Sequence, residues 1–245
     1  MAEPRCIAVT GLAFEARIAA GPGVTVVCGG TRLKLVRSLE ASLRQGCRGI
    51  LSFGIAGGLA PHLGAGDCVI ARNIIADHGN YPSNREWAQS LVAMIRGAAK
   101  DAEPSKAMLR NVSFGDIAGS DAPIACTRAK QSLYEQTGAI AVDMESHVAA
   151  RFAAEHRIPF AAFRVVTDPS HRPLPPAALV ATRHEGTIDA VAVFRSLIRS
   201  PRQVPALVRL AFDSWAARQT LVPGRRLLGA NLGLPDIREH LLDVA

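Results

Sequence analysis

The segment AIAVDMESHVAARFAAEHRIPFAAFRVVTD, residues 139–168, decides the fold class. It begins with a short apolar run, continues with an alanine-rich stretch, and ends in a second apolar run, so it predicts strand, helix and strand. Asp143 and Glu145 follow the first predicted strand, and Asp168 closes the second. Because buried carboxylates are costly, these strand ends either reach solvent or take part in chemistry.

The same alternation runs through most of the chain. Residues 6–20 and 23–47 each predict a strand, a loop with glycine and a helix, and residues 48–77 predict a strand, a glycine-rich turn, a loop and another strand. Further predictions are a helix over 87–98, a polar loop over 101–106, a strand and turn within 113–126, and a helix over 187–198. Alternating strands and helices indicate an α/β protein with helices on both faces of a sheet.

Composition excludes several classes of protein. The chain has 245 residues, 49% of them hydrophobic, which is enough for one well-buried core. Its five cysteines form no CxxC pair, which argues against a zinc site and for reduced thiols in a cytoplasmic protein. No apolar run reaches the roughly 20 residues of a membrane-spanning helix. The net charge of +7 suits an anionic substrate or surface, but no arginine-plus-aromatic motif indicates nucleic acid.

Chemically useful residues gather at the predicted strand ends, where ligands bind in such sheets. They are Gly11, Glu15, Gly29, Gly57, Glu145 and Asp168. Each also has a structural interpretation: a tight turn for the glycines, a first-turn helix acid for Glu15 and Glu145, and an Asx-turn for Asp168. The histidines at 78, 147, 171 and 184 have no metal-ligand spacing and are predicted to lie at the surface or in loops.

Three ordered motifs resemble one family. GIAGGL at 54–59, AVDMES at 141–146 and RVVTD at 164–168 are similar to the nucleoside phosphorylases and nucleosidases, over about residues 7–198. The resemblance implies a three-layer α/β/α sandwich around a twisted mixed sheet. It also implies cleavage of the N-glycosidic bond of a purine nucleoside. Residues 207–229 resemble the ending of hopanoid-associated phosphorylases, which implies release of adenine from adenosylhopane.

The resemblance also implies roles for individual residues. Asp168 matches the general acid that protonates purine N7, Glu145 the residue that holds the ribose hydroxyls, and Glu15 the acid that positions a water nucleophile. The other matched positions are Met144 near the sugar, Ile124 against the purine, and Ala56 and Gly57 where nucleophile and sugar meet. From the residues alone, Thr167 is placed to hydrogen-bond Asp168.

Two positions depart from the family pattern. Pro123 stands where nucleosidases carry an aromatic residue, and Glu15 stands where phosphorylases tend to carry an arginine for phosphate. Phosphate is still expected to find backbone N–H groups and charge at Gly29, Gly30, Arg32 and Arg17. Water and phosphate therefore both stay open as the nucleophile. No cofactor or metal is predicted, apart from phosphate as an optional co-substrate.

The chain is predicted to contain a catalytic domain, residues 1–200, and a basic amphipathic extension, residues 201–245. The extension places Leu207, Leu210, Ala211 and Trp215 on one helical face. That face either lies on the inner, anionic face of a membrane or packs on the core or a second subunit. A homo-oligomer is expected by analogy. Two other functions stay open: a methylthioadenosine/adenosylhomocysteine nucleosidase, and a nucleoside- or lipid-binding module without activity.

Overall fold

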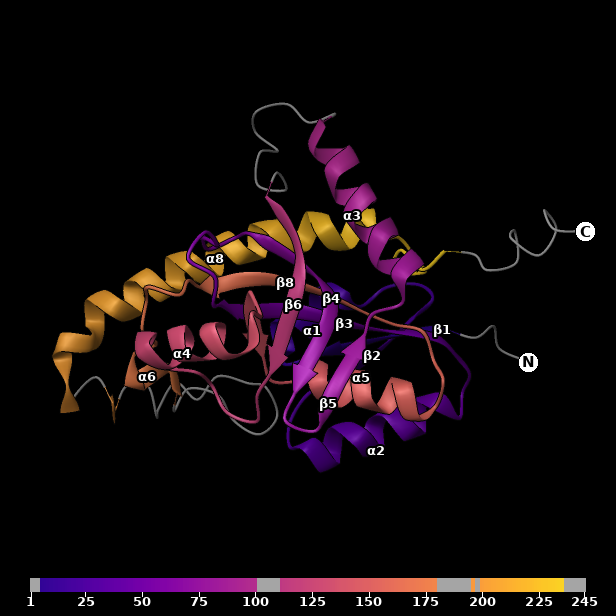
Figure 1. The fold of residues 1–245 in the computed structure, drawn as a ribbon, viewed down its shortest axis with the longest axis horizontal. Coiled ribbons are helices and arrows are strands. Elements are labelled where there is room, and N and C mark those ends of the chain that lie inside the picture. Colours follow the sequence, from indigo (N-terminus) through magenta and orange to yellow (C-terminus); the bar gives the residue numbers. More distant parts are fainter. Residues whose placement is uncertain (1–4, 101–110, 180–194, 197–198, 236–245) are drawn as a thin grey trace, which may run out of the picture.

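The computed structural model describes residues 5–100, 111–179, 195–196 and 199–235 (Figure 1). The loop predicted over 101–106, most of the helix predicted over 187–198, and His184 lie outside these residues. Within the described part of the chain, no helix is both long and apolar enough to span a bilayer.

Strands far apart in sequence join in one mixed sheet. They are β1 (Arg5–Thr10), β2 (Val24–Cys28), β3 (Cys47–Gly58), β4 (Cys68–Ala76), β5 (Gly79–Pro82), β6 (Val112–Gly119), β7 (Ala141–Asp143) and β8 (Phe160–Asp168). The order is β2-β1-β3-β7-β6-β4-β5, and β8 pairs with both β3 and β4. Strands β3, β7, β6, β4 and β8 therefore form a closed ring of paired strands, with β7 antiparallel to β3 and β8 parallel to it.

Helices cover both faces of this sheet, which confirms the predicted three-layer α/β/α architecture (Figure 1). The apolar side chains of α2 (Arg32–Leu43) and α5 (Ser146–Glu155) join one core cluster. Those of α1 (Ala13–Ala19), α3 (Arg85–Lys100) and α8 (Val204–Leu227) join the other. Other helices with described bounds are α4 (Thr127–Thr137), α6 (Pro176–Leu179) and the 3-10 helix η2 (Pro201–Gln203).

The helix ends follow from local chemistry. Helix α2 begins after Thr31, whose side chain accepts a hydrogen bond from the Lys34 N–H, and it buries Leu35 and Leu39 one turn apart. Helix α4 ends at Gly138, which adopts the left-handed conformation with φ of 68° that glycine tolerates best. In the chain, α2 lies between β2 and β3, and α4 directly precedes β7. One end of each helix therefore leads into a strand.

The glycine-rich segment differs from its prediction. A turn was expected at 53–59, but β3 continues through Gly57 and Gly58, which pair with β7, while Gly57 also pairs with Asp168 of β8. Strand partners on both sides take up the backbone hydrogen bonds, so the chain stays extended there. The glycines serve close packing instead, because a Cβ on Gly57 would lie 3.1 Å from the Asp168 carboxylate.

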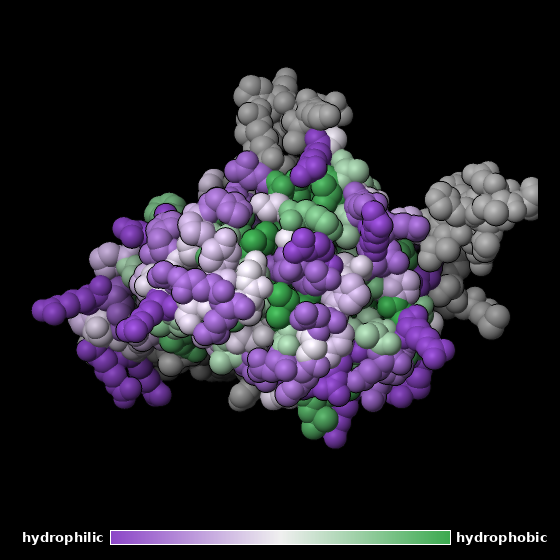
Figure 2. Space-filling view, in the orientation of Figure 1, coloured by the Kyte–Doolittle hydropathy of each residue, from purple (hydrophilic) through white to green (hydrophobic). Residues whose placement is uncertain are grey.

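The two halves of α8 have different surroundings. Its second half buries Ala217, Leu221 and Gly224, and Arg225 donates from Nε to the Ala19 carbonyl at 2.7 Å. Its first half exposes a run of large apolar residues: Val204, Val208, Phe212 and Trp215. Figure 2 shows hydrophilic side chains projecting around the left-hand end of the molecule, where α8 begins in Figure 1.

Candidate active site at the strand ends

Glu15 is buried at the start of α1 and is held by backbone N–H groups. Its Oε2 accepts hydrogen bonds from Gly11 and Leu12, both at 2.8 Å, and its Oε1 accepts one from Ile55 at 2.7 Å. Burial raises the pKa of the Glu15 carboxyl, while the nearby Arg164 and the three N–H donors lower it. Glu15 is therefore no solvated helix-start acid. It links α1 to the middle of β3.

Arg164 of β8 is the central buried cation of this edge. Its side chain is fully buried, with Nη2 2.5 Å from the Asp143 carboxylate and 2.6 Å from the Ser52 hydroxyl. The Ser146 hydroxyl donates to Asp143 as well. The charge of Arg164 is thus balanced chiefly by Asp143, and the pair anchors the end of β7 to β8.

Glu145 lies beside this ion pair but remains partly open. Its Oε2 is 3.5 Å from Arg164 Nη2, and its side chain is 19% exposed. Burial raises the pKa of Glu145 to about 8, and the charges of Asp143 and Glu15 act in the same direction, while Arg164 opposes them. A Cβ on Gly11 would lie 2.6 Å from Glu145 Oε1, so only glycine leaves room for this carboxyl next to α1.

Asp168 ends β8 in a separate hydrogen-bonded pair. Its Oδ2 is 2.7 Å from the ammonium of Lys130, and its Oδ1 accepts a hydrogen bond from the Thr167 hydroxyl at 2.9 Å. Burial raises the pKa of the Asp168 carboxyl, and Lys130 opposes the shift. The predicted bond between Thr167 and Asp168 is therefore present. Lys130, which α4 contributes, was not predicted.

The acids converge on three consecutive residues of β3. The Ile55 N–H binds Glu15, the Ala56 carbonyl accepts from Thr167 at 3.4 Å, and Gly57 pairs with Asp168. Because a strand rises about 3.3 Å per residue, this segment is only about 7 Å long. Residues 15 and 168, far apart in sequence, thus meet at the Ile55–Gly57 segment of β3.

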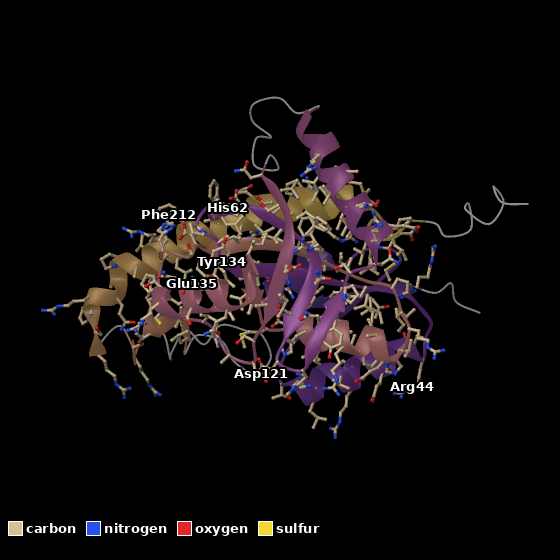
Figure 3. All side chains as sticks on the ribbon, viewed as in Figure 1. Arg44, His62, Asp121, Tyr134, Glu135 and Phe212 are labelled. Atoms are coloured by element: carbon tan, nitrogen blue, oxygen red, sulfur yellow. The ribbon has the colours of Figure 1, made fainter. Side chains whose placement is uncertain are left out.

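Two further residues that were predicted to contact the substrate are Met144 and Ile124. Met144 is 41% exposed and follows directly after Asp143, so its thioether is free to meet a ligand. Ile124 is partly buried and packs against the small core cluster that includes Leu59 and Val142, the latter beside Gly57. Tyr134 of α4 belongs to the same cluster, and Figure 3 shows it on the α4 side of the sheet.

The residues proposed for phosphate are placed differently. The Gly29 N–H already donates to the Thr10 carbonyl at 2.6 Å, so it is not available to an anion. Arg17 is exposed on α1, and Gly30 is exposed with φ of 135°. Arg32 lines a small hollow together with Asp121 and His147. No arginine of this set contacts Glu15 or Asp168 among the described contacts.

The prediction for His147 was wrong, and the buried position of Arg164 was not predicted. His147 was expected at the surface but is buried, with Nε2 3.0 Å from the Asp121 carboxylate, because it lies in the first turn of α5 under the sheet edge. Figure 3 labels Asp121 at this edge. Arg164 had a visible signal, because it interrupts an otherwise apolar β8. Within the described residues, no cluster of His, Cys, Asp or Glu could hold a metal ion.

The fold and these carboxylates define an α/β protein with a candidate site, formed by several acids, at the ends of β3, β7 and β8. Comparison with known proteins then identifies the family. The family model of the phosphorylase superfamily matches residues 3–199, so the chain belongs to the phosphorylase superfamily. This finding agrees with the resemblance carried by the three sequence motifs.

Individual relatives are more distant. A 5'-methylthioadenosine/S-adenosylhomocysteine nucleosidase of Mycobacterium bovis is 28% identical over 167 residues, which cover 55% of this chain and 66% of the relative. The chain therefore spans somewhat less than two thirds of that relative. A mutant nucleosidase of Helicobacter pylori with 5'-methylthioadenosine in its active site has a TM-score of 0.59 at 12% identity, with 100% of both chains covered. Futalosine hydrolase of the same species has a TM-score of 0.56 at 15% identity, covering 80% of this chain and 97% of that one. The two structures support the fold alone.

Proposed function

We propose that this protein cleaves the N-glycosidic bond of a purine nucleoside and releases the base. The observation that carries the proposal is the convergence of three acids: Glu15 and Asp168 meet residues 55–57 of β3, and Glu145 lies near Glu15 and beside Arg164. Cleavage of this bond leaves positive charge on the sugar and negative charge on the base. Carboxylates beside the sugar and a proton donor beside the base match that charge pattern.

Each acid has its own task in this proposal. Glu145, partly open and next to Met144, accepts hydrogen bonds from the ribose hydroxyls. Asp168 donates a proton to purine N7, which makes the base a better leaving group and contributes about 10²–10⁴-fold. Glu15 orients the nucleophilic water and takes its proton as the water adds to the sugar carbon. Backbone N–H groups occupy three of the roughly four acceptor positions of Glu15, which leaves one for a water molecule.

The charges of the site favour water over phosphate. Glu15, Glu145 and Asp143 surround one cation, Arg164, and Asp143 already neutralises it at 2.5 Å. Among the described contacts, a phosphate dianion would find no unpaired cation at this position to offset the cost of burying its charge. Hydrolysis, with free ribose or its derivative as product, is therefore the proposed reaction.

Adenosylhopane is the proposed substrate. Support comes from the resemblance of residues 207–229 and from the exposed apolar residues of α8, since a hydrocarbon-linked nucleoside resides in a bilayer. We also propose that the protein is a cytoplasmic homo-oligomer and that it contacts the inner face of the membrane. The second candidate is a methylthioadenosine/adenosylhomocysteine nucleosidase, which the 28% identical Mycobacterium relative favours.

One assay separates these functions. The protein is incubated with adenosylhopane, methylthioadenosine or adenosylhomocysteine, with and without phosphate, and free adenine and the sugar product are measured. Adenine release from adenosylhopane with an unphosphorylated sugar is expected. Release from the soluble nucleosides alone would favour the second candidate, a sugar phosphate would show phosphorolysis, and absence of adenine throughout would contradict the proposed function.

Two variants test the role of the acid. Asp168→Asn removes the proton donor and should lower the turnover number by about 10²–10⁴-fold. Asp116→Asn is the matched control, because Asp116 of β6 is a carboxylate that is also paired with a cation, Arg72 of β4. The control should retain the activity of the unmodified protein. Equal activity of both variants would contradict the assignment of Asp168.

A further inference from the structure

Lys130 places a buried ammonium against one short segment of the chain. Its Nζ donates to Asp168 Oδ2 at 2.7 Å, and to the backbone carbonyls of Asp168, Pro169 and Arg172 at 2.8, 3.1 and 3.0 Å. The side chain is 0% exposed. Four acceptors thus surround a group with three N–H bonds, and the Asp168 carboxylate is the only anion among them.

The position of Lys130 within α4 is unusual for a lysine. It lies on the buried face of the helix, three, four and seven residues before Leu133, Tyr134 and Thr137, which are partly buried. An apolar side chain is the ordinary occupant of such a position. Buried ion pairs add little stability compared with apolar residues of similar volume, so stability alone does not account for this lysine.

The ion pair of Lys130 and Asp168 is separate from the neighbouring charged side chains. The Arg172 side chain turns away to α8, where it binds both carboxylate oxygens of Asp213. The Thr167 hydroxyl adds a neutral donor to the other oxygen of Asp168. No further charged side chain is among the described hydrogen-bond partners of Lys130 and Asp168. The proton of the Nζ–Oδ2 hydrogen bond is therefore the one that can pass between the two groups.

We propose that Lys130 supplies the proton that Asp168 delivers to the departing base. This inference rests on the proposed function. A Lys130 N–H bond breaks and an O–H bond forms on Asp168, which converts the ion pair into a neutral amine and a carboxylic acid. The 2.7 Å separation between Lys130 Nζ and Asp168 Oδ2 is short enough for direct transfer of this proton along the existing hydrogen bond.

The proton then passes to the purine. The Asp168 O–H bond breaks as a bond forms to N7, and the electron pair of the glycosidic bond leaves with the base. Asp168 is again a carboxylate and Lys130 a neutral amine. A proton from solvent restores the ammonium after the base departs. Lys130 acts through Asp168 and is therefore a positioning and proton-supplying residue that does not touch substrate.

A substrate whose leaving group needs no proton distinguishes this role from simple anchoring of residues 168–172. Lys130→Met should lower turnover of a purine nucleoside by about 10²–10⁴-fold, the same range as Asp168→Asn. Turnover of p-nitrophenyl riboside should fall by less than about tenfold, because nitrophenolate departs without protonation. Equal losses on both substrates would overturn the inference, since a misplaced segment affects both.

Two further variants complete the test. Lys130→Arg keeps a positive charge and N–H donors, but guanidinium does not release its proton, so this variant should lose purine activity like Lys130→Met. Full purine activity of Lys130→Arg would overturn the inference. Lys34→Met, an exposed lysine on α2, is the matched control and should behave as the unmodified protein. Thermal unfolding checks that each variant folds.

If Lys130→Met does not fold, Lys130→Gln carries the same comparison, because its amide keeps N–H donors without a transferable proton. Failure of the inference is distinct from failure of the proposed function. Absence of base release from every purine nucleoside by the unmodified protein would overturn the function and the inference together. Activity of the unmodified protein with equal losses for both leaving groups would overturn only the role of Lys130.

Discussion

Glu145 is a carboxyl group with a raised pKa that lies near neutrality. Its side chain lies against Asp143, Glu15 and Arg164, and burial raises its pKa to about 8 in the folded protein. The pKa of a glutamate in the unfolded chain is about 4.3. Between these two values the folded protein holds a proton that the unfolded chain releases. The free energy of unfolding therefore falls as pH rises through this window.

Replacement of Glu145 tests this linkage. In Glu145→Gln, the fall in the free energy of unfolding between about pH 5 and about pH 8 should be smaller, by up to about 1.4 kcal/mol per pH unit. Urea denaturation at several pH values measures the slope. Glu155→Gln, an exposed glutamate on α5, is the control and should leave the slope unchanged. The same slope in Glu145→Gln as in the control would contradict the raised pKa.

At the scale of elements, the position of α8 depends on a glycine. Helix α8 packs on β8 at Gly224, where a Cβ would lie 2.7 Å from the Phe163 ring. Phe163 is fully buried and stacks on Phe53 of β3, with ring centroids 5.4 Å apart. The ring therefore has little room to move, and the close approach of helix and strand requires a residue without a side chain.

A pair of glycine substitutions tests this packing. Gly224→Ala should lower the free energy of unfolding by about 1–3 kcal/mol, because the added methyl group overpacks the core. Gly97→Ala is the matched control on α3, where a Cβ would meet nothing within 4 Å. The control should raise stability by about 0.5–1 kcal/mol, because alanine is the better helix former. Equal effects of the two changes on thermal unfolding would contradict the packing argument.

On the scale of the whole molecule, the first half of α8 presents an apolar stripe that nothing described covers. Its members, Val204, Val208, Phe212 and Trp215, are 45%, 50%, 69% and 58% exposed. At 100° per residue they fall within about 80° of the helix circumference. Arg209 and Arg218 flank this stripe, and the only acid of α8, Asp213, is paired with Arg172. Apolar residues between cations suit an anionic bilayer surface.

Vesicle binding tests this surface. The unmodified protein should sediment with vesicles that contain phosphatidylglycerol, and less so at high salt or with phosphatidylcholine alone. Replacing both Phe212 and Trp215 by serine should weaken binding about tenfold or more. Leu33→Ser removes an equally exposed apolar residue on α2 and should have no effect. Loss of a dimer in the double variant, without vesicle binding by the unmodified protein, would show that the stripe contacts a second subunit.

Sequence patterns were sufficient for the layers, and they singled out three acids that the structure brings close together. Apolar periodicity separated strands from helices, and the carboxyl ends of strands pointed to Glu15, Glu145 and Asp168. Patterns were insufficient for Gly54–Leu59, where partner strands on both sides kept β3 extended. They were insufficient also for Lys130, because nothing local distinguishes a buried lysine from a solvated one.

The sequence by itself determined the order of strands and helices and the residue types available at their ends. Only the tertiary structure decided which of these residues share a site, which N–H groups are already used, and which cation balances which acid. The reason is physical. Periodicity and propensity act over a few residues, whereas charge pairing and desolvation depend on distances between atoms of segments more than 100 residues apart, such as Glu15 and Arg164.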